Sequence, residues 1–233
     1  MTEPRIRRRL PLLWVLLIFV ALVGVVLAVA IPATRARSTA GAEHHHGETS
    51  PPGTPAQAAF HDQMRKLWED HVTWTRLAIV TFADGSTGFG PTADRLLQNQ
   101  ADLGAAIEPY YGKAAGAALT SLLRDHITVA VDILKAAKAG DTAAVKQAST
   151  RWYANADDIA DLLAKANPRF WPAQAMRAAM KAHLDQTLAE ASHELGGRYA
   201  ASVADYDAIH HHILAMADQL SAGIVGQFPA RFR

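Results

Sequence analysis

The sequence predicts an all-α protein with an N-terminal transmembrane helix, followed by a six-helix antiparallel bundle built from three helical-hairpin repeats. Three observations support this prediction. An uncharged stretch stands near the N-terminus, and apolar residues beyond it recur at steps of three and four, with no segment alternating at period two. A histidine also interrupts an apolar helix face three times, at His71, His126 and His183. The near-constant step between them, 55 and then 57 residues, is typical of repeated structural units.

The N-terminal segment has the pattern of a membrane anchor. Residues 1–9 carry four arginines, and the next 22 residues, 10–31, carry no charge. About 20 apolar residues cross a bilayer as a helix, and the arginine excess before the span favours a cytoplasmic N-terminus. We therefore expect residues 1–9 in the cytoplasm, an anchor at 10–32, and the rest of the chain outside the cytoplasm. The alternative is a cleaved signal peptide, because Ala28-Val29-Ala30 resembles a cleavage site.

A linker and a folded domain follow the anchor. Residues 33–56 are small, polar and rich in proline, which is typical of a flexible linker. Its adjacent histidines, His44 to His46, have nothing nearby to fix a metal geometry, so we interpret them as solvated. The bundle is then expected over residues 57–228, with a short tail at 229–233.

Charge and composition exclude some classes of partner and site. Residues 38–233 hold 17 Lys and Arg against 21 Asp and Glu, and this negative balance argues against binding nucleic acid. The chain has no cysteine, so it can form neither disulfides nor thiolate metal sites.

Glycine and proline divide the domain into six helices. The first is expected from Ala58 to Phe82, before a break at residues 84–91. Thr92 can cap the second, which should end at Glu108 because Pro109 follows. The third should reach Lys138, and Asp141 can cap a fourth that ends at Ala166. Residues 167–172, NPRFWP, form the next loop, with Pro172 suited to the first position of the fifth helix. The sixth follows Gly196-Gly197 and continues to about Val225.

The histidines are expected to lie in one polar layer across the bundle. His126 precedes the turn at Gly140 by nearly the distance at which Asn155 follows it, so both should lie at the same height. The same argument places His183 level with His210, and His71 roughly level with Asn99 and Asp102. Asp158 is expected at the edge of the layer. Of the adjacent histidines at 210–212, His210 is our choice for the inner position, since at most two of them can face the core.

Two interpretations of this layer remain open. In the first, each histidine forms a hydrogen bond with an Asn or Asp across its hairpin and helps to set the register of the helices. In the second, His71, His126, His183 and His210 hold a transition metal such as zinc, copper or iron. The pairs Glu190 with His193 and Asp207 with His210, each three residues apart, add support to a metal. A ferritin-like di-iron site needs a second Glu-x-x-His motif at the same height, which the sequence lacks.

Four sequence motifs, LWEDHVTWTR, RLLQNQ, ANADDIA and HHILAMADQLS, resemble a family of little-characterised bacterial helical proteins. Some members of that family carry automatic names such as glycosyltransferase. The resemblance covers roughly residues 61–228 and implies a secreted or membrane-anchored helical domain. It transfers no functional residue to this chain. The sequence also lacks the strand-helix alternation and the Gly-rich phosphate loop of nucleotide-dependent enzymes.

Two classes of function follow. The first is a non-catalytic extracytoplasmic binding or sensing domain, whose ligand is a metal or small molecule at the polar layer. The second is a structural or protein-interaction module of the cell envelope, whose histidines serve only the fold. No serine-nucleophile motif or isolated carboxylate pair points to a hydrolase. Nine residues inside the cell cannot form an output domain, so any signal would pass through an envelope protein partner.

Overall fold

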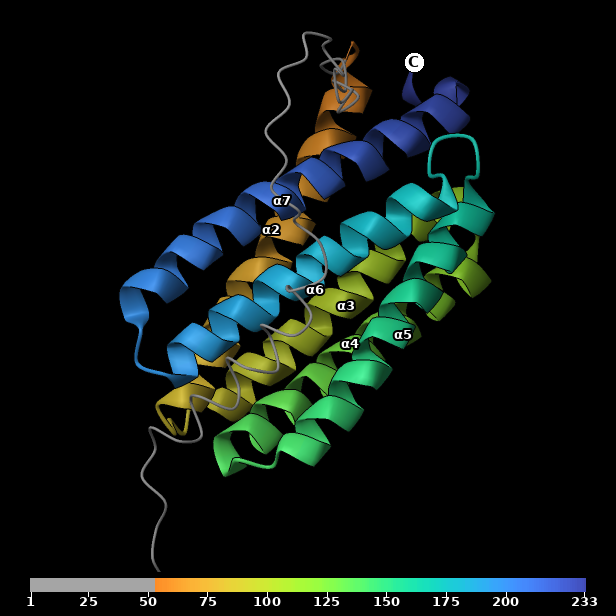
Figure 1. Cartoon of the computed structure of the whole chain (residues 1–233). Coiled ribbons are helices and arrows are strands. Elements are labelled where there is room, and N and C mark those ends of the chain that lie inside the picture. The colour runs from red at the N-terminus through yellow and green to blue at the C-terminus, as the bar shows by residue number, and fades with distance from the viewer. Residues whose placement is uncertain (1–52) are drawn as a thin grey trace, which may run out of the picture.

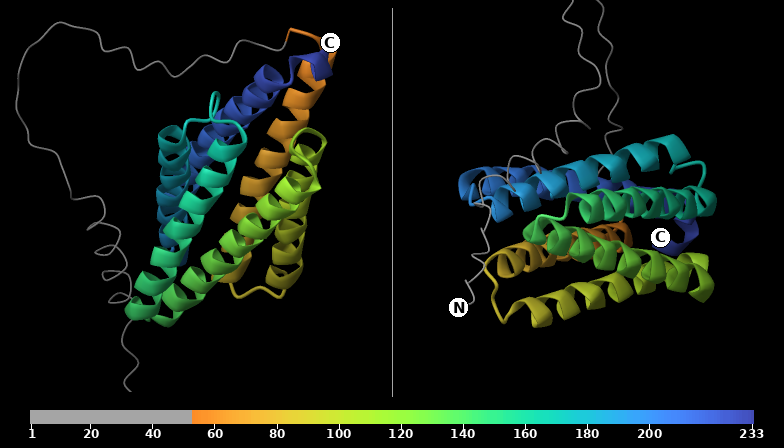
Figure 2. Two further views of the ribbon diagram at one scale, coloured as in Figure 1. Left: turned by 90° about the vertical axis from the view of Figure 1, so that its right-hand side faces the viewer. Right: turned by 60° about the horizontal axis from the view of Figure 1, so that its bottom comes forward.

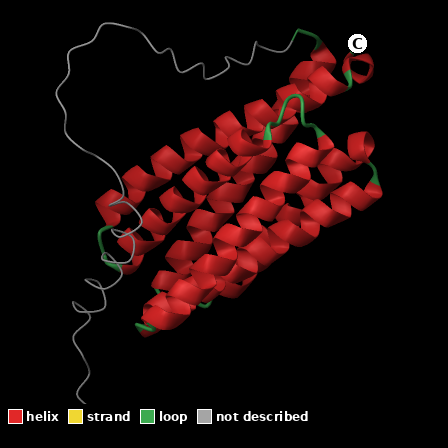
Figure 3. Ribbon diagram, turned by 45° about the vertical axis from the view of Figure 1, so that its right-hand side comes forward, coloured by secondary structure: helices red, strands yellow, loops and turns green. Residues whose placement is uncertain are grey.

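Six long helices pack side by side in the computed structural model, which describes residues 53–233 (Figure 1). Each helix is antiparallel to the next and packs against it, and the last returns to pack against the first (Figure 2). The described part of the chain contains helices and loops and no strand (Figure 3). The helices are α2 (Pro55–Ala83), α3 (Phe89–Tyr111), α4 (Lys113–Ala139), α5 (Thr142–Ala166), α6 (Ala173–Leu195) and α7 (Tyr199–Gln227).

The all-α antiparallel bundle predicted from the sequence is therefore confirmed. The predicted anchor at residues 10–32 and most of the linker lie outside the described residues. Within residues 53–233, none of the helices combines the length and hydropathy that a membrane span requires.

Most of the predicted helix ends are confirmed by local chemistry. The Asp141 side chain accepts a hydrogen bond from the backbone N–H of Ala144 at 2.9 Å and caps α5 as expected. Gly140, with φ of 72°, ends α4 in the left-handed conformation that glycine adopts without strain. Pro172 stands one residue earlier than predicted, at the N-cap of α6.

The predicted bounds of α3 were wrong at both ends. The helix begins at Phe89 instead of after Thr92, whose hydroxyl donates back to the carbonyl of Gly88 at 2.8 Å. It also continues past Pro109 to Tyr111. A proline this close to the end of a helix removes one backbone hydrogen bond, and the helix stops at Gly112, where φ is 85°.

The two ends of the described chain pack against each other. Thr54 caps α2 and donates its hydroxyl to the carbonyl of Phe232 at 2.7 Å. Residues 229–233, expected to be a tail, form a 3-10 turn (Pro229–Phe232) that buries Phe232 against Phe60. The linker predicted to reach residue 56 gives way to α2 at Pro55.

Glycines allow α3 and α4 to approach closely. A Cβ atom built on Gly104 would lie 2.6 Å from the carbonyl oxygen of Gly116 and 1.9 Å from the hydroxyl of Thr120. A Cβ atom on Gly116 would lie 2.7 Å from the carbonyl oxygen of Gly104. Only hydrogen fits at these two positions, so the contact fixes the distance between the two helices.

The 167–172 loop is anchored on α7. Trp171 is 1 % exposed, and its ring occupies the space that a side chain at Gly223 would take. Asn167 donates its amide N–H to the carbonyl of Gly223 at 2.9 Å. Trp171 and Asn167 therefore anchor the loop on α7.

Candidate binding site

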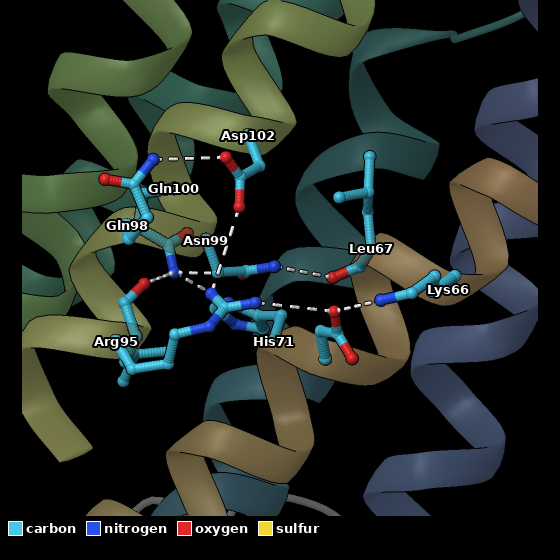
Figure 4. A network of polar contacts seen from close by, with 10 residues as sticks. Lys66, Leu67, His71, Arg95, Gln98, Asn99, Gln100 and Asp102 are labelled. Atoms are coloured by element: carbon cyan, nitrogen blue, oxygen red, sulfur yellow. Dashed lines mark hydrogen bonds and ion pairs between the residues drawn. The ribbon is translucent and has the colours of Figure 1, made fainter.

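One contact recurs in all three helical hairpins, α2–α3, α4–α5 and α6–α7. In each hairpin, the backbone carbonyl one turn before the buried histidine accepts a hydrogen bond from a side chain of the second helix. Donor and acceptor are 3.0 Å apart in each case, for Asn99 to Leu67, Asn155 to Leu122 and His212 to Ala179. Figure 4 shows the first of these contacts, with Asn99 on α3 and Leu67 on α2.

A second relation joins each histidine to the residue 29 positions later. The amide of Gln100 donates to Nδ1 of His71 at 3.2 Å. Nδ1–H of His126 donates to the amide oxygen of Asn155 at 2.8 Å. In the third hairpin the same position is His212, whose ring stacks on that of His183 with centroids 6.2 Å apart. The layer is thus a set of amide and imidazole pairs across the hairpins.

The side chains of His71, His126, His183 and His212 form what we call the histidine layer. The first three are buried, as predicted, and His212 is half-buried. The rings of His71 and His183 lie 5.7 Å apart. His126 is close enough to the other rings to lower the pKa of His71 and of His183 electrostatically.

Burial keeps these rings neutral. Loss of hydration lowers the pKa of His71 to about 3 and that of His126 to about 4, against an ordinary value of 6.5. Burial and the neighbouring imidazoles lower the pKa of His183 well below 6.5, and burial also lowers the pKa of His212. Neutral imidazoles are metal ligands and hydrogen-bonding groups, so the geometry has to distinguish these roles.

The third hairpin departs from the other two because its histidine has no amide partner. Nδ1 of His183 is buried and has no hydrogen-bond partner among the described residues. In the first hairpin, Gln100 Oε1 and Trp68 Nε1 are also buried without a partner among the described residues. Unpaired buried polar atoms are uncommon in folded proteins, so hydrogen bonding around the layer is incomplete in the first and third hairpins.

His210 does not lie in the layer, although the sequence placed it there. Its Nε2 pairs with the carboxylate of Glu69 at 2.9 Å on the surface of α2 and α7. The inner position belongs to His212 instead. The sequence does contain a signal that predicts His212. Asn155 follows His126 by 29 residues, and the same step leads from His183 to His212 and from His71 to Gln100.

The predicted acidic partners also lie outside the layer. Asp102 accepts a hydrogen bond from Gln98 at 3.1 Å and lies near Arg95 on the surface (Figure 4). Asp158 and Asp207 are exposed. Asn99 contacts the backbone of Leu67, and the partner of the His71 ring is Gln100 instead. Of the predicted partners, only Asn155 bonds to a layer histidine ring.

The pair Glu190 and His193 does not form a ligand set. Glu190 points to Arg76 at 2.9 Å, whereas His193 pairs with Asp205 at 2.5 Å. Residues 53–233 contain no group of three or more His, Asp or Glu side chains placed to hold a metal ion.

A buried ionic cluster, which the sequence analysis missed, joins α2, α6 and α7. The guanidinium of Arg76 contacts Glu190, Glu194 at 3.2 Å and Ser202, and Ser202 donates to Glu194 at 2.6 Å. Burial raises the pKa of Glu190 to about 7, and the attraction of Arg76 only partly opposes this rise. The sequence signal is the pair of glutamates one helical turn apart on α6, which require a cation if that face is buried.

An apolar cavity lies directly beside the histidine layer, toward the turns at Gly85, Gly140 and Gly197. Helices α2 to α6 all contribute to its walls, and the centre of a water-sized sphere can move through about 40 Å³ of it. Thr75 and Thr187, one turn after His71 and His183, donate their hydroxyls to the carbonyls of those histidines. The other lining side chains are apolar, Trp152 included, and the indole N–H of Trp152 donates to the carbonyl of His126 at 3.0 Å. The cavity therefore offers no free hydrogen-bonding group to a ligand.

Comparison with protein-family models, curated proteins and solved structures finds no match to this chain. The family resemblance noted in its motifs therefore stays a prediction.

Proposed function

We propose that the protein is a membrane-anchored, extracytoplasmic and non-catalytic binding or sensing domain, which holds a small apolar ligand in its core. The observation that carries this proposal is the cavity beside the histidine layer, because five helices line it and only apolar groups face it. Cavities of this kind stay dry and take up small apolar molecules. The extracytoplasmic location rests on the arginines before the uncharged segment at residues 10–31.

In this proposal the three hairpins are copies of one unit, and the histidine layer forms one end of the cavity. The recurring carbonyl contacts set the register of each hairpin, which favours a common origin. The layer holds its helices apart with imidazole and amide groups. In this proposal the histidine layer acts on the ligand only through the shape that it gives to the cavity.

Benzene and xenon test the proposal without a known ligand. A molecule that binds only the folded state raises its stability by mass action, and each kcal/mol raises the melting temperature of a domain of this size by about 2–4 °C. We expect benzene to raise the melting temperature of the full chain in a bile-salt detergent. Ala137 lines the cavity, so Ala137→Leu should remove the effect. Ala139→Leu, at an exposed position of the same helix, should keep it.

The alternative is a structural or interaction module of the cell envelope. The hydrogen bonds of His71 and His126 favour it, because each of these rings is paired with an amide side chain across its hairpin without any ligand. This alternative predicts no response to benzene or xenon, in the wild-type chain as in both variants. A melting temperature that does not change with either probe would therefore reject the binding function.

A further inference from the structure

The lining of the cavity extends furthest along α4 and covers shorter stretches of α2 and α6. Its lining on α4 runs over the eleven residues from Ile127 to Ala137, whose Cα atoms span about 15 Å at a rise of about 1.5 Å per residue. Within that length, the centre of a water-sized sphere has only about 40 Å³ to move in. A slender molecule fits such a space, whereas a body of several fused rings does not.

The walls exclude charged and hydrogen-bonding groups. Apart from Thr75 and Thr187, every lining side chain is apolar, and both threonine hydroxyls are occupied by backbone carbonyls. A polar group moved from water into this space would lose its hydrogen bonds and gain none. The buried part of the ligand therefore consists of C–H groups alone.

A polar head can remain in water where α4 and α6 border the cavity. These two helices are not sequential neighbours, and they face each other across the cavity with α5 contributing only Trp152 to its wall. Val131 on α4 and Leu188 on α6 are half-buried, so the lining reaches the surface here.

From these features we infer that the cavity takes a single unbranched alkyl chain of an amphiphile, whose polar head stays in solvent. The inference rests on the proposed binding function and names its ligand class. Each methylene that moves from water into the cavity raises affinity about fourfold. The gain stops when the chain fills the cavity, which sets an upper limit on useful chain length.

Photo-crosslinking of the full chain tests this inference. The probe is decanol with a diazirine near its methyl end, and the protein is kept in a bile-salt detergent that contributes no alkyl chain. We expect the label on peptides that contain residues 127–137 and 187–191. Unlabelled octanol should compete about 16-fold more strongly than hexanol, from two added methylenes. The compact cage of 1-adamantanol should not compete.

Two alanines on α4 give a matched pair of variants. Ala137 lines the cavity, and Ala139 is exposed two residues later. Ala137→Leu adds the bulk of about three methylenes and should lower labelling about tenfold or more, while Ala139→Leu should leave it unchanged. Should Ala137→Leu fail to fold by circular dichroism, Ala191→Val narrows the same cavity from α6 and takes its place.

Two results would overturn the inference. The first is equal labelling of the wild-type chain and the filled-cavity variant, which would place the probe on the surface. The second is absence of label and of alkanol competition while benzene still raises the melting temperature. In that case the binding function stands and the ligand class is wrong, whereas loss of both responses rejects both.

A second experiment distinguishes two sources of the alkyl chain, a membrane lipid and a free amphiphile. The full chain in phospholipid nanodiscs is exposed to a phospholipid with a diazirine in one acyl chain. Label on the same two segments identifies a membrane lipid as the source. Label with decanol alone identifies a free amphiphile.

Discussion

The histidine layer contains side chains with different hydrogen-bonding states. The Nδ1–H of His126 donates to Asn155, and the backbone carbonyl of His126 accepts from Trp152. His183 occupies the equivalent place in the third hairpin, but its Nδ1 is buried without a partner in the described chain. Similar burial thus has opposite energetic consequences, since a satisfied polar group stabilises the fold and an unsatisfied one costs free energy.

We therefore expect leucine to act differently at these two positions. His126→Leu should lower the free energy of unfolding by about 1–3 kcal/mol, because Asn155 loses the donor to its amide oxygen. His183→Leu removes an unpaired buried nitrogen and should change stability by less than about 1 kcal/mol. Urea unfolding of both variants beside the wild-type chain measures the difference. Equal losses of unfolding free energy in the two variants would show that the hydrogen bonds of His126 do not stabilise the fold.

Acid should destabilise the fold through the same residues. The pKa of His71 is about 3 and that of His126 about 4 in the folded chain, against 6.5 when unfolded. As pH falls below about 6.5, the unfolded rings bind protons while the folded rings stay neutral until about pH 4. Stability therefore falls across this window, by about 1.4 kcal/mol per pH unit for each ring. Glu190 acts in the opposite direction, because its raised pKa of about 7 stabilises the fold below 4.5 and loses that effect as pH rises toward 7.

The contribution of one ring can be isolated. His126→Leu removes one of the protons taken up on unfolding, so its stability should change less steeply between pH 4.5 and 6.5 than that of the wild-type chain. Free energies of unfolding measured in urea at several pH values give both slopes. If stability changes equally steeply with pH in the variant and in the wild-type chain, burial does not hold His126 neutral.

At the scale of the helices, close packing depends on a few positions that cannot be exchanged. The α3–α4 contact at Gly104 and Gly116 brings two backbones together, and the ionic cluster around Arg76 connects α2 to α6 and α7. Neither contact is visible in the hydrophobic pattern of a single helix. Both depend on which residues of two helices meet.

Gly104→Ala should therefore destabilise the bundle. Its Cβ would overlap the hydroxyl of Thr120 and the carbonyl of Gly116, and overpacking of this kind costs about 1–3 kcal/mol. Gly90→Ala in the same helix is the control, since nothing lies within 4 Å of its Cβ position. That control should stabilise the protein by about 0.4–1 kcal/mol by restricting the unfolded chain. Thermal or urea unfolding checks both, and a neutral Gly104→Ala would contradict the close approach.

The buried and surface arginines of α2 should also differ. Arg76→Met would leave Glu190 and Glu194 buried without a cation, and we expect a loss of about 3–5 kcal/mol. Arg65→Met breaks a partly exposed pair with Asp218 and should cost no more than about 1 kcal/mol. The comparison uses urea unfolding at pH 7.5. Similar losses in the two variants would show that the buried cluster adds little to stability.

At the scale of the whole molecule, the six helices form a closed ring in which α7 packs beside α2. The C-terminal turn covers the start of α2, so the two ends of the described chain stabilise each other. Truncation at either end would thus expose the core that Phe60 and Phe232 share. The predicted anchor at residues 10–32 is expected to lie in the membrane and not in this ring of helices.

The predicted topology has a direct test. Four arginines before the uncharged segment favour a cytoplasmic N-terminus, so residues 38–233 should lie outside the cytoplasm. Protease added to intact spheroplasts should then digest the domain, while a cytoplasmic marker stays protected. Complete protection of the domain would contradict this topology, and release of an intact domain without protease would indicate a cleaved signal peptide.

The sequence by itself determined the helices, because their signals are local. Apolar spacing reports one helix face, and Gly140, Asp141 and the 167–172 loop interrupt it through backbone conformation and capping. The burial of His71, His126 and His183 followed from the same spacing. Pro109 shows the limit of local signals, since a proline near a helix end costs too little to stop it.

Only the tertiary structure decided which side chains meet. The choice of His212 over His210 depends on how α7 is rotated against α6, and a rotation by two residues exchanges the inner and outer faces. The Arg76 cluster joins residues more than 100 positions apart, which no spacing within one helix predicts. The cavity is a property of five helices together, because it exists only where their side chains fail to fill the space between them.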